Sequence, residues 1–549
     1  MTGWLLVLAL ASAGPASAQV IERHLPPVPS SAPPQLGERT QPAETDDRPF
    51  GSRLIGIVLL GPGEAVPMAP VQGVEIGNLA PLRRVALIRA LVPLLGQPLS
   101  RRLIAEVRVV VSRRYRRAGY PFVSVTTPEQ ELTGGTLTLR VVEFKAGRLR
   151  VRSTRAGAVD RVAGRIRFPA DGRIDARALQ QDLAWLDRNP FRRTGAVFSA
   201  GAELATTDMT ITVVPTRPWQ AFAGVSSSDS PSTGNVRFYA GALAGGLLGT
   251  DSILSAQATT SGFGDPSYLG VGVRVVEPLG VRRELSLLVG YVRSDASAAP
   301  FSSLAHTVEG SLDLRFALPP RLAGDGHLGI EAGYQRIEAR FGGEPIFRVD
   351  ASTLALFARY TATVSLHGGT LSTDVALHAS PGGIGSNNRA DRLFYGQERS
   401  GSATYTYLTA EGTLDHMIAS RLGWQTQLII QVSPNPLPGL DQIGLGGSSY
   451  VRGYTLDDGG YDTGVVARNT LTLAADQLSR LAAYAFTDWG YGVVVDTPRH
   501  STFGSIGVGF SRALGWGVRV RAEVALPLLD GPRTTAIHPR AFARAEFAL

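Results

Sequence analysis

The chain has 549 residues, of which 63 are glycine and 18% are charged, and its net charge is +8. This length exceeds one ordinary core and predicts several domains, while the composition favours strands and turns over disorder or a helical bundle. Because the chain contains no cysteine, disulfide frameworks, thiolate metal sites and cysteine nucleophiles are excluded.

The charge is unevenly distributed. Residues 50–217 contain 26 Lys and Arg against 13 Asp and Glu, a balance of +13, whereas residues 218–549 contain 25 against 28, a balance of −3. No basic patch in the first region is interleaved with stacking aromatics, so we expect no nucleic-acid partner. Solvated helix faces explain the excess most simply, and attraction to an acidic polypeptide is the alternative.

The first 50 residues have the pattern of an export signal followed by a linker. An apolar run from Trp4 to Leu10, followed by Ala16-Ser17-Ala18, predicts a signal peptide over residues 1–18. Residues 19–50 are rich in proline and predict a semi-extended linker with at most a short plug segment. No later run of about 18 uncharged apolar residues occurs, so no membrane-spanning helix is predicted.

Two small α+β domains are predicted next, over residues 51–144 and 145–217. In the first, a strand precedes two helical patterns, and two alternating strands separated by Gly134-Gly135 follow. The second ends with one clear helix and two strands. The predicted elements are 54–60, 82–95, 101–118, 122–127 and 136–142 in the first domain, and 147–151, 175–187, 196–200 and 208–215 in the second.

From Trp219 onward the helical pattern gives way to a period of two. Residues 307–316 alternate charged and apolar side chains, and the same period recurs at 371–379, 424–432 and 516–526. Such strands fit a soluble sandwich or a membrane barrel, and the preceding signal peptide favours the barrel. About 10 residues per spanning strand, plus connections, give roughly 14 to 18 strands over residues 218–549.

Two short motifs late in this region predict an internal ion pair. In Val451-Arg452-Gly453-Tyr454, preceded by Gly446-Gly447, the glycines would let a loop drive one guanidinium into a confined space. In Phe486-Thr487-Asp488-Trp489-Gly490, a carboxylate stands on a predicted strand. An Arg–carboxylate pair adds orientation as well as energy, so it could pin a long loop inside a barrel.

The roles of the two motifs follow from this pairing. We expect Arg452 at the tip of an inward-folded loop and Asp488 on the barrel wall that receives it. Phe486 and Tyr454 would pack around the pair, while Gly453 and Gly490 would permit close approach.

The V-R-G-Y and F-x-D-x-G motifs resemble the paired signature of the outer-membrane translocases related to BamA. Residues 119–123 and 135–143 resemble the first polypeptide-transport-associated (POTRA) domain of two-partner secretion transporters of the haemolysin secretion/activation type, and residues 186–191 resemble the second. This resemblance implies a transmembrane antiparallel barrel of 16 strands in the cell outer membrane. Two POTRA domains in the periplasm would precede it.

The resemblance also implies a function. Such a transporter recognises a specific large exoprotein of the adhesin or haemolysin type (TpsA type) in the periplasm and exports it unfolded through the barrel pore. It is not an enzyme and uses no metal or other cofactor. Its other partners are outer-membrane lipid and, during biogenesis, periplasmic chaperones and the barrel-assembly machinery.

Docking of the client would use strand addition, because an extended segment can pair with an exposed sheet edge. In a POTRA sheet, the middle strand in sequence lies at the edge. The predicted client-binding residues are therefore Phe122, Val123, Ser124 and Val125 in the first domain and Val197 and Phe198 in the second.

Three other function classes account for parts of this pattern. The leading alternative is an assembly factor that inserts outer-membrane β-barrel proteins. An outer-membrane lipase or protease is disfavoured because the chain has no G-x-S-x-G and no H-E-x-x-H motif. A passive porin would leave the two N-terminal domains unexplained. We interpret five histidines as polar-face or surface residues rather than ligands: His306, His327, His367, His378 and His416.

Overall fold

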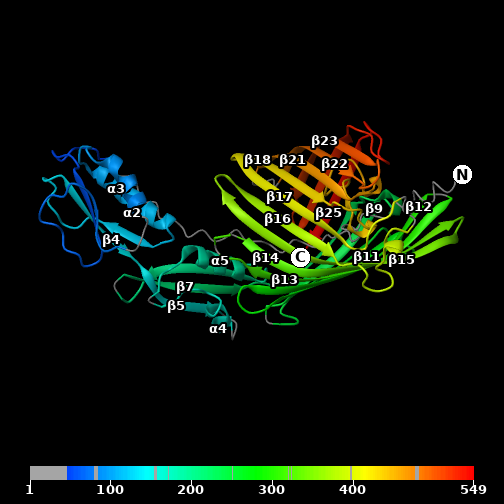
Figure 1. Cartoon of the computed structure of the whole chain (residues 1–549), viewed down its shortest axis with the longest axis horizontal. Coiled ribbons are helices and arrows are strands. Elements are labelled where there is room, and N and C mark those ends of the chain that lie inside the picture. Colours follow the sequence, from blue (N-terminus) through cyan, green and yellow to red (C-terminus); the bar gives the residue numbers. More distant parts are fainter. Residues whose placement is uncertain are drawn as a thin grey trace. The chain divides into compact units, whose positions relative to one another are not determined.

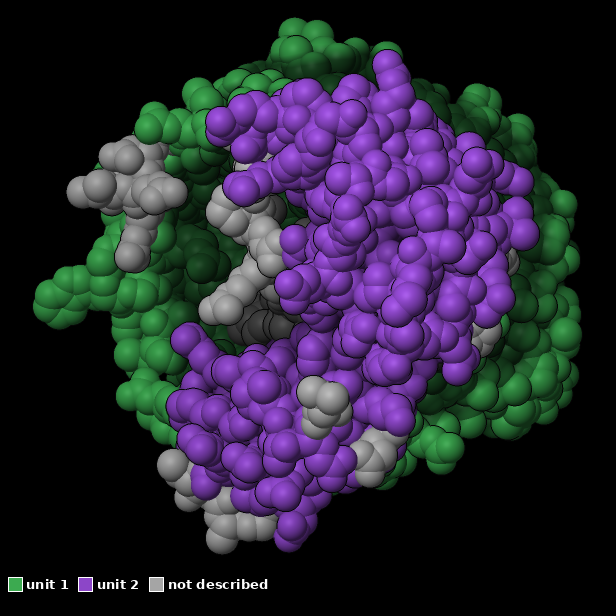
Figure 2. All heavy atoms as spheres, turned by 90° about the vertical axis from the view of Figure 1, so that its left-hand side faces the viewer, with its two compact units in different colours: residues 1–27, 217–549 green, residues 28–216 purple. Residues whose placement is uncertain are grey.

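The computed structural model describes residues 46–549 except for 80–83, 121, 154–157, 171, 204, 250, 299, 320, 323, 396–398 and 477–480. The predicted signal peptide, residues 1–18, and nearly all of the predicted linker therefore lie outside the described residues. The described chain falls into two compact units, residues 46–216 and residues 217–549 (Figure 2).

The N-terminal unit begins with a four-stranded sheet in the order β2-β1-β4-β3. Strand β2 runs parallel to β1 and was not predicted, because Gly-Val-Glu-Ile is too short to show a period. The elements of this first domain are β1 (Gly56–Leu60), β2 (Gly73–Ile76), α2 (Arg84–Leu91), η2 (Val92–Leu94), α3 (Arg101–Arg117), β3 (Val123–Thr126) and β4 (Thr136–Glu143).

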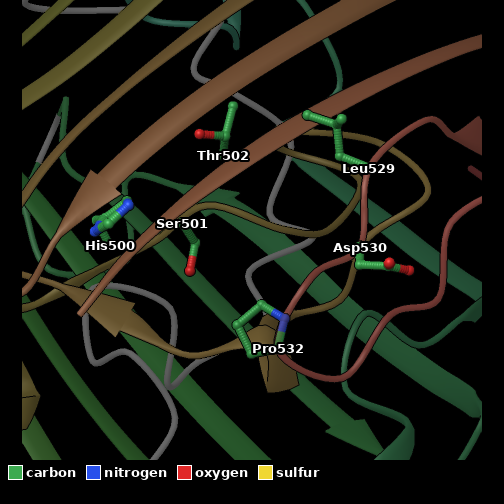
Figure 3. A pocket seen from close by; sticks show the side chains of 6 residues that line it. All are labelled: His500, Ser501, Thr502, Leu529, Asp530 and Pro532. Atoms are coloured by element: carbon green, nitrogen blue, oxygen red, sulfur yellow. The ribbon is translucent and has the colours of Figure 1, made fainter. Parts of the chain in front are cut away.

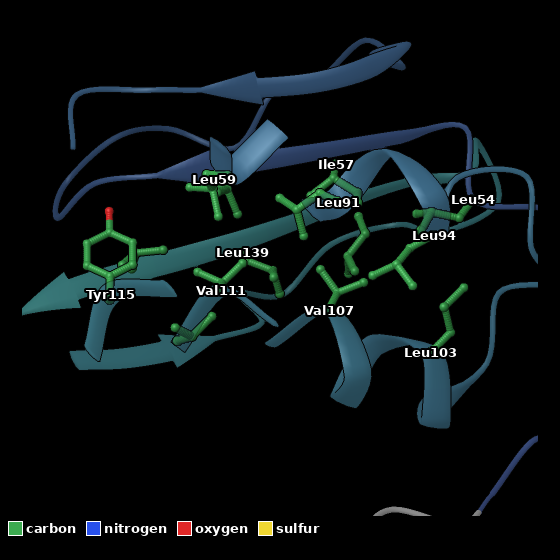
Figure 4. Packing of buried hydrophobic residues seen from close by; sticks show 14 of the residues in the cluster. Leu54, Ile57, Leu59, Leu91, Leu94, Leu103, Val107, Val111, Tyr115 and Leu139 are labelled. Carbon is green, nitrogen blue, oxygen red and sulfur yellow. The ribbon is translucent and has the colours of Figure 1, made fainter. Parts of the chain in front are cut away.

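Helix α3 supplies most of the core of this first domain. It begins at Ser100, whose side chain accepts a hydrogen bond from the Leu103 amide, as an N-cap should. Its buried residues, Leu103, Val107, Val111 and Tyr115, recur every fourth position and pack on Leu59 and Leu139 of the sheet (Figure 4). Burial of each such side chain stabilises the domain by roughly 1.5–3 kcal/mol.

A three-stranded sheet in the order β5-β7-β6 forms the second domain. Asp175 caps its main helix and accepts hydrogen bonds from two backbone amides, while Leu179, Leu183 and Leu186 are buried against the sheet. The elements are β5 (Lys145–Ser153), α4 (Ala158–Ala163), α5 (Ala176–Asp187), β6 (Arg192–Ala200) and β7 (Thr206–Pro215). No helix in the described parts of the chain is long and apolar enough to cross a membrane.

The C-terminal unit is a closed antiparallel barrel of sixteen strands, counted over the described residues (Figure 1). The predicted fold class is therefore confirmed. The strands are β8 (Trp219–Ser227), β9 (Val236–Gly245), β10 (Ile253–Thr260), β11 (Tyr268–Pro278), β12 (Arg283–Ala298), β13 (Phe301–Ala317), β14 (Gly324–Phe341), β15 (Glu344–Leu366), β16 (Gly369–Ser380), β17 (Tyr405–Ala419), β18 (Leu422–Val432), β21 (Thr463–Asp476), β22 (Leu481–Val493), β23 (His500–Ala513), β24 (Val518–Pro527) and β25 (Arg540–Ala548).

The alternation in sequence becomes an alternation between the two faces of the wall. On β22, Phe486 and Asp488 point inward and are buried, whereas Trp489 and Tyr491 point outward and are exposed. Short helices lie in the connections: η3 (Pro231–Thr233) between β8 and β9, and α6 (Ala390–Leu393) between β16 and β17.

A long loop, residues 433–462, connects β18 to β21 and packs against the inner wall. It contains η4 (Gly439–Asp441), β19 (Ile443–Gly444), η5 (Leu456–Asp458) and β20 (Gly460–Tyr461). Leu445, Val451 and Tyr454 of this loop are fully buried in one apolar cluster with Phe503 of β23. The barrel therefore holds a structured internal loop with its own small core.

Candidate functional site

The tip of the long loop is a tight glycine-dependent turn. Gly447 and Gly453 have φ angles of 101° and 94°, a region that side-chain-bearing residues rarely adopt. A Cβ at Gly446 would lie 2.1 Å from the Thr455 carbonyl oxygen. The turn is closed by the Gly447 amide, which donates to the Tyr454 carbonyl at 3.0 Å. These glycines allow residues 451–454 to double back and point Arg452 at the wall.

Arg452 and Asp488 form a fully buried, bidentate ion pair. The Arg452 side chain is 1% exposed and that of Asp488 is 0% exposed. Arg452 Nη2 donates to Asp488 Oδ1 at 2.6 Å, and Nε donates to Oδ2 at 2.7 Å. The Arg452 backbone amide adds a third bond to Oδ2 at 3.1 Å. The structure thus brings together the two charged residues that the motifs predicted.

Two further wall residues hold the guanidinium. The Phe486 ring lies beneath it, with the guanidinium carbon 3.6 Å from the ring centroid. Thr470 on β21 accepts a hydrogen bond from Nη2 at 3.1 Å. At the facing position, a Cβ on Gly490 would come within 2.8 Å of Val451, which explains the glycine in the second motif. Thr470 had no signal in the sequence.

Tyr454 does not pack around the ion pair, contrary to prediction. Its ring meets Phe503 edge-on, with centroids 4.9 Å apart. Its hydroxyl donates to the carbonyls of Gly504 and Leu529, the latter at 2.7 Å. The φ angle at Gly453 turns the chain between Arg452 and Tyr454, so the two side chains anchor the loop at separate places on the wall.

An open recess of about 450 Å³ lies beside the Tyr454 anchor. His500, Ser501 and Thr502 line it from β23, and Leu529, Asp530 and Pro532 line it from the facing loop (Figure 3). Leu529 thus both lines the recess and accepts the Tyr454 hydroxyl through its carbonyl. The recess borders the anchor and has no charged pair of its own.

A second buried Arg–Asp pair holds the other end of the loop. Arg399, from the connection between β16 and β17, binds both carboxylate oxygens of Asp462, which is 0% exposed. The amides of Leu437 and Val495 also donate to this carboxylate, at 2.9 and 2.8 Å. Asp462 therefore joins three separate connections of the barrel.

The part of the long loop that precedes the Arg452 turn is attached to the barrel wall through Asp441. The Tyr405 hydroxyl donates to this carboxyl, and Glu331, His378 and Tyr407 surround it from the wall. The surrounding protein, which keeps water away, raises the pKa of Asp441 to about 7; the Tyr405 hydrogen bond opposes this shift and the nearby Glu331 adds to it. The His378 imidazole lies 2.6 Å from Glu331 and stacks on the Tyr407 ring.

Two adjacent carboxylates near the end of the loop bind other loops. Asp457 accepts hydrogen bonds from Ser230 and Ser232, and Asp458 accepts them from Arg533 and Thr534. Sequence reasoning missed these aspartates. The spacing Thr455-x-x-Asp458 was the available signal, because it forms a capping box at the start of η5.

The predicted client-binding strands do lie at sheet edges. β3 is an edge of the first small sheet, and β6 is an edge of the second and starts four residues before the predicted strand. Of the residues nominated there, Val197 is 66% exposed, whereas Val125 is buried in the first core. Val123 and Ser124 are half-buried.

Phe122 and Phe198 contact each other where the two small sheets meet. Their ring centroids are 4.6 Å apart, and both pack against the second core. Arg173 reinforces this joint: its guanidinium lies 4.0 Å from the Tyr120 ring centroid and donates to the Ala118 carbonyl at 2.9 Å. The two phenylalanines are therefore part of a joint, and Val197 is the exposed residue among the six that were nominated.

Two of the five histidines are buried on the inner wall, each within hydrogen-bond distance of a carboxylate. His327 lies 3.0 Å from Asp313 and His378 lies 2.6 Å from Glu331, and both are 6% exposed. His306 instead contacts Tyr291 on the outer face. Over the described residues, no group of three or more His, Asp or Glu could hold a metal ion.

Comparisons with known proteins show which families this chain is similar to. Residues 325–512 match the family described as haemolysin secretion/activation protein ShlB/FhaC/HecB, and residues 69–143 match the POTRA domain, ShlB-type. No curated protein sequence matches the chain.

Two solved structures are similar to the whole chain. CdiB from Escherichia coli is 18% identical, with a TM-score of 0.66 over 100% of this chain and 98% of that one. CdiB from Acinetobacter baumannii is 12% identical, with a TM-score of 0.62 over 95% of each chain. At these identities the likeness establishes the fold.

Proposed function

From the matches of residues 325–512 and 69–143, we propose that the chain is a member of the ShlB/FhaC/HecB family of haemolysin secretion/activation proteins, an outer-membrane β-barrel transporter with periplasmic POTRA domains. From this premise we propose that it recognises one large exoprotein of the adhesin or haemolysin type and exports it unfolded through the pore. Residues 1–18 are then the signal peptide, 19–50 the linker, 51–144 and 145–217 the POTRA domains, and 218–549 the pore.

The observation that carries this proposal is the loop pinned inside the closed barrel by Arg452 and Asp488. A porin needs an open lumen, whereas this lumen holds a loop with a buried core and several polar anchors. Such a loop has to be displaced or bypassed by a chain in transit. Within the part of the chain that the structure describes, β3 and β6 are edge strands, and this supports recognition because an extended client segment can add to an edge as a further strand.

Mass spectrometry of culture supernatants from wild-type and deletion strains tests the proposal, with outer-membrane fractions measured in parallel. We expect one large secreted protein to be lost while the membrane proteome is unchanged. Depletion of many barrel proteins from the membrane would instead assign the chain to the assembly factors and overturn the export proposal.

The role of the ion pair is tested in the complemented deletion strain. We expect Arg452→Ala to leave the barrel inserted but to lower export of the client sharply, because the loop tip loses its wall anchor. Arg315→Ala is a matched control, since Arg315 pairs with Glu284 and Asp325 on neighbouring wall strands. Normal export by a correctly inserted Arg452→Ala barrel would contradict this role.

A further inference from the structure

The barrel closes where its first strand, β8, meets its last, β25. Five Cα partners link these strands in the described residues, from Phe222 with Ala548 to Ser226 with Arg544. The next shortest strand pairings around the barrel, β9 with β10, β10 with β11 and β24 with β25, have eight Cα partners each. Because backbone hydrogen bonds between neighbours hold a barrel closed, this closing seam has the fewest bonds to lose.

Two hairpin loops flank the seam. The first hairpin loop, residues 228–235, joins β8 to β9, and the last hairpin loop, residues 528–539, joins β24 to β25. Because strand direction alternates around the barrel, both open at the same end as the long loop 433–462. Contacts from the long loop can therefore reach both sides of the seam.

Asp457 binds the first hairpin loop. Its carboxylate accepts from the Ser232 amide at 2.8 Å and from the hydroxyls of Ser230 and Ser232. Nearby, the Leu456 amide donates to the Asp229 carbonyl at 2.8 Å. Ser448, before the Arg452 turn, donates to the Asp229 carboxylate through its amide and its hydroxyl.

Asp458 binds the last hairpin loop. Its carboxylate accepts from the amides of Arg533 and Thr534 at 2.8 and 2.9 Å, and from the Thr534 hydroxyl at 2.6 Å. It is 1% exposed, and Thr455 completes its set of donors. The Tyr454 hydroxyl adds a bond to the Leu529 carbonyl of the same loop. Neighbouring carboxylates thus bind opposite sides of the seam.

The first hairpin loop is a fixed support for these contacts. Arg237, which is 0% exposed, donates to the carbonyls of Thr233, Gly234 and Val236 and stacks on the Tyr268 ring at 4.4 Å. This loop cannot follow a displaced partner without breaking bonds of its own. Movement of the long loop is therefore opposed at the seam.

We propose that the long loop is a strap across the closing seam, with Asp457 and Asp458 as the residues that hold the two seam-flanking hairpin loops together. The position of the loop and the closure of the barrel are then coupled. By reciprocity, anything that displaces the loop loosens the seam, and anything that opens the seam releases the loop. This inference concerns closure of the barrel and does not rest on the identity of the client.

Hydrogen exchange of the purified full chain in lipid nanodiscs tests the strap. We expect Asp457→Asn and Asp458→Asn, singly and together, to speed exchange in residues 219–227 and 540–548. The expected factor is about tenfold, as for the loss of a hydrogen bond to a charged group. Exchange in β16 and β17, across the barrel, should stay unchanged. An unchanged seam, or equal acceleration in all strands, would overturn the proposal.

Three further variants sharpen the test. Asp462→Asn frees the same loop from the β16–β17 connection, so it should speed exchange in residues 433–442 but not at the seam. Ser230→Ala with Ser232→Ala removes the two hydroxyl donors to Asp457, leaves the Ser232 amide in place and changes no aspartate. This double variant should also speed seam exchange, and it keeps the test open if the aspartate variants fail to assemble. The chain has no cysteine, so Val225→Cys with Ala545→Cys can cross-link two register partners. Oxidation of that pair should cancel the added exchange, and persistence of the exchange would count against the strap.

Discussion

The long loop is held by two buried Arg–Asp pairs that differ in how they are supported. At the Arg452 pair the loop supplies the arginine, and every described hydrogen bond to Asp488 comes from that one residue. At the Arg399 pair the loop supplies the aspartate, and Asp462 also binds Gln442 and the amides of Leu437 and Val495. Two pairs with the same chemistry should therefore differ in what their loss costs.

This difference shows that burial and geometry do not by themselves determine how much free energy of unfolding is lost when an ion pair is broken. A buried carboxylate with several other donors keeps most of its partners when one arginine is removed. A carboxylate with a single donor residue loses its counter-charge and keeps at most a backbone amide as donor, and a buried charge in that state is the expensive one. Asp488, the carboxylate of the Arg452 pair, has a single donor residue and is therefore the second kind of carboxylate.

The largest effect is expected at the Arg452 pair. Arg452→Ala should lower the free energy of unfolding of the barrel by on the order of 3–5 kcal/mol, because Asp488 stays buried and charged without its guanidinium and keeps only the backbone amide of residue 452 as a described donor. Asp488→Ala should cost a similar amount, and the double variant should cost less than the sum because no charge is left alone. Urea midpoints in detergent, followed by the gel mobility of the folded barrel, measure these costs. Additive costs would contradict the pairing.

A smaller effect is expected at the second pair. Arg399→Ala should cost about 1.5–3 kcal/mol, the range for hydrogen bonds to a charged group, because Asp462 keeps its amide donors. The same urea series measures it. A cost equal to that of Arg452→Ala would show that the additional donors of Asp462 contribute nothing.

The smallest effect is expected at Asp441, where it depends on pH. The docked loop favours the neutral carboxyl, so docking is strongest below the ordinary pKa of 3.8 and weakens as pH rises through about 7. Hydrogen exchange of residues 433–442, corrected for the intrinsic rate, should quicken by up to roughly a hundredfold between pH 5 and pH 8, because the carboxyl ionises over about two pH units of that range only when the loop is undocked.

Two variants isolate the carboxyl from its neighbours Glu331, His378, Tyr405 and Tyr407. Asp441→Asn should remove the pH dependence, and Glu331→Gln should reduce it by removing the nearby negative charge. A pH dependence that survives in Asp441→Asn would assign the titration to a group other than this carboxyl.

Local patterns in the sequence predicted the strands and the Arg452–Asp488 pair, whereas the choice of a barrel also needed the predicted signal peptide, and the number of sixteen strands came from the family resemblance. Alternation of side chains fixes the two faces of a strand, and glycines around a lone arginine indicate a buried loop tip. Strand β2 was missed because four residues carry too little periodicity. The wrong position for Tyr454 arose because the φ angle of Gly453 sends the next side chain to a different part of the wall.

The partners of the anchors Asp441, Asp457, Asp458 and Asp462 could not be predicted for a different reason, although the capping-box spacing of Thr455 and Asp458 indicated a helix start. Each binds residues far away in the sequence, such as Asp458 with Thr534 and Asp462 with Arg399. An aspartate in a polar loop is usually solvated, and only the closure of the barrel brings its partners within reach. The sequence pattern around these residues is that of an ordinary turn.

The joint between Phe122 and Phe198 sets the spacing of the two sheet edges in the N-terminal unit. If each edge accepts one short extended segment, the first segment to bind confines the second to a small volume, which raises its effective concentration. Two individually weak contacts then combine into avidity. Selection would depend on the distance between two segments of the client as much as on the sequence of either one, so insertions between those segments would be tolerated poorly even where both are intact.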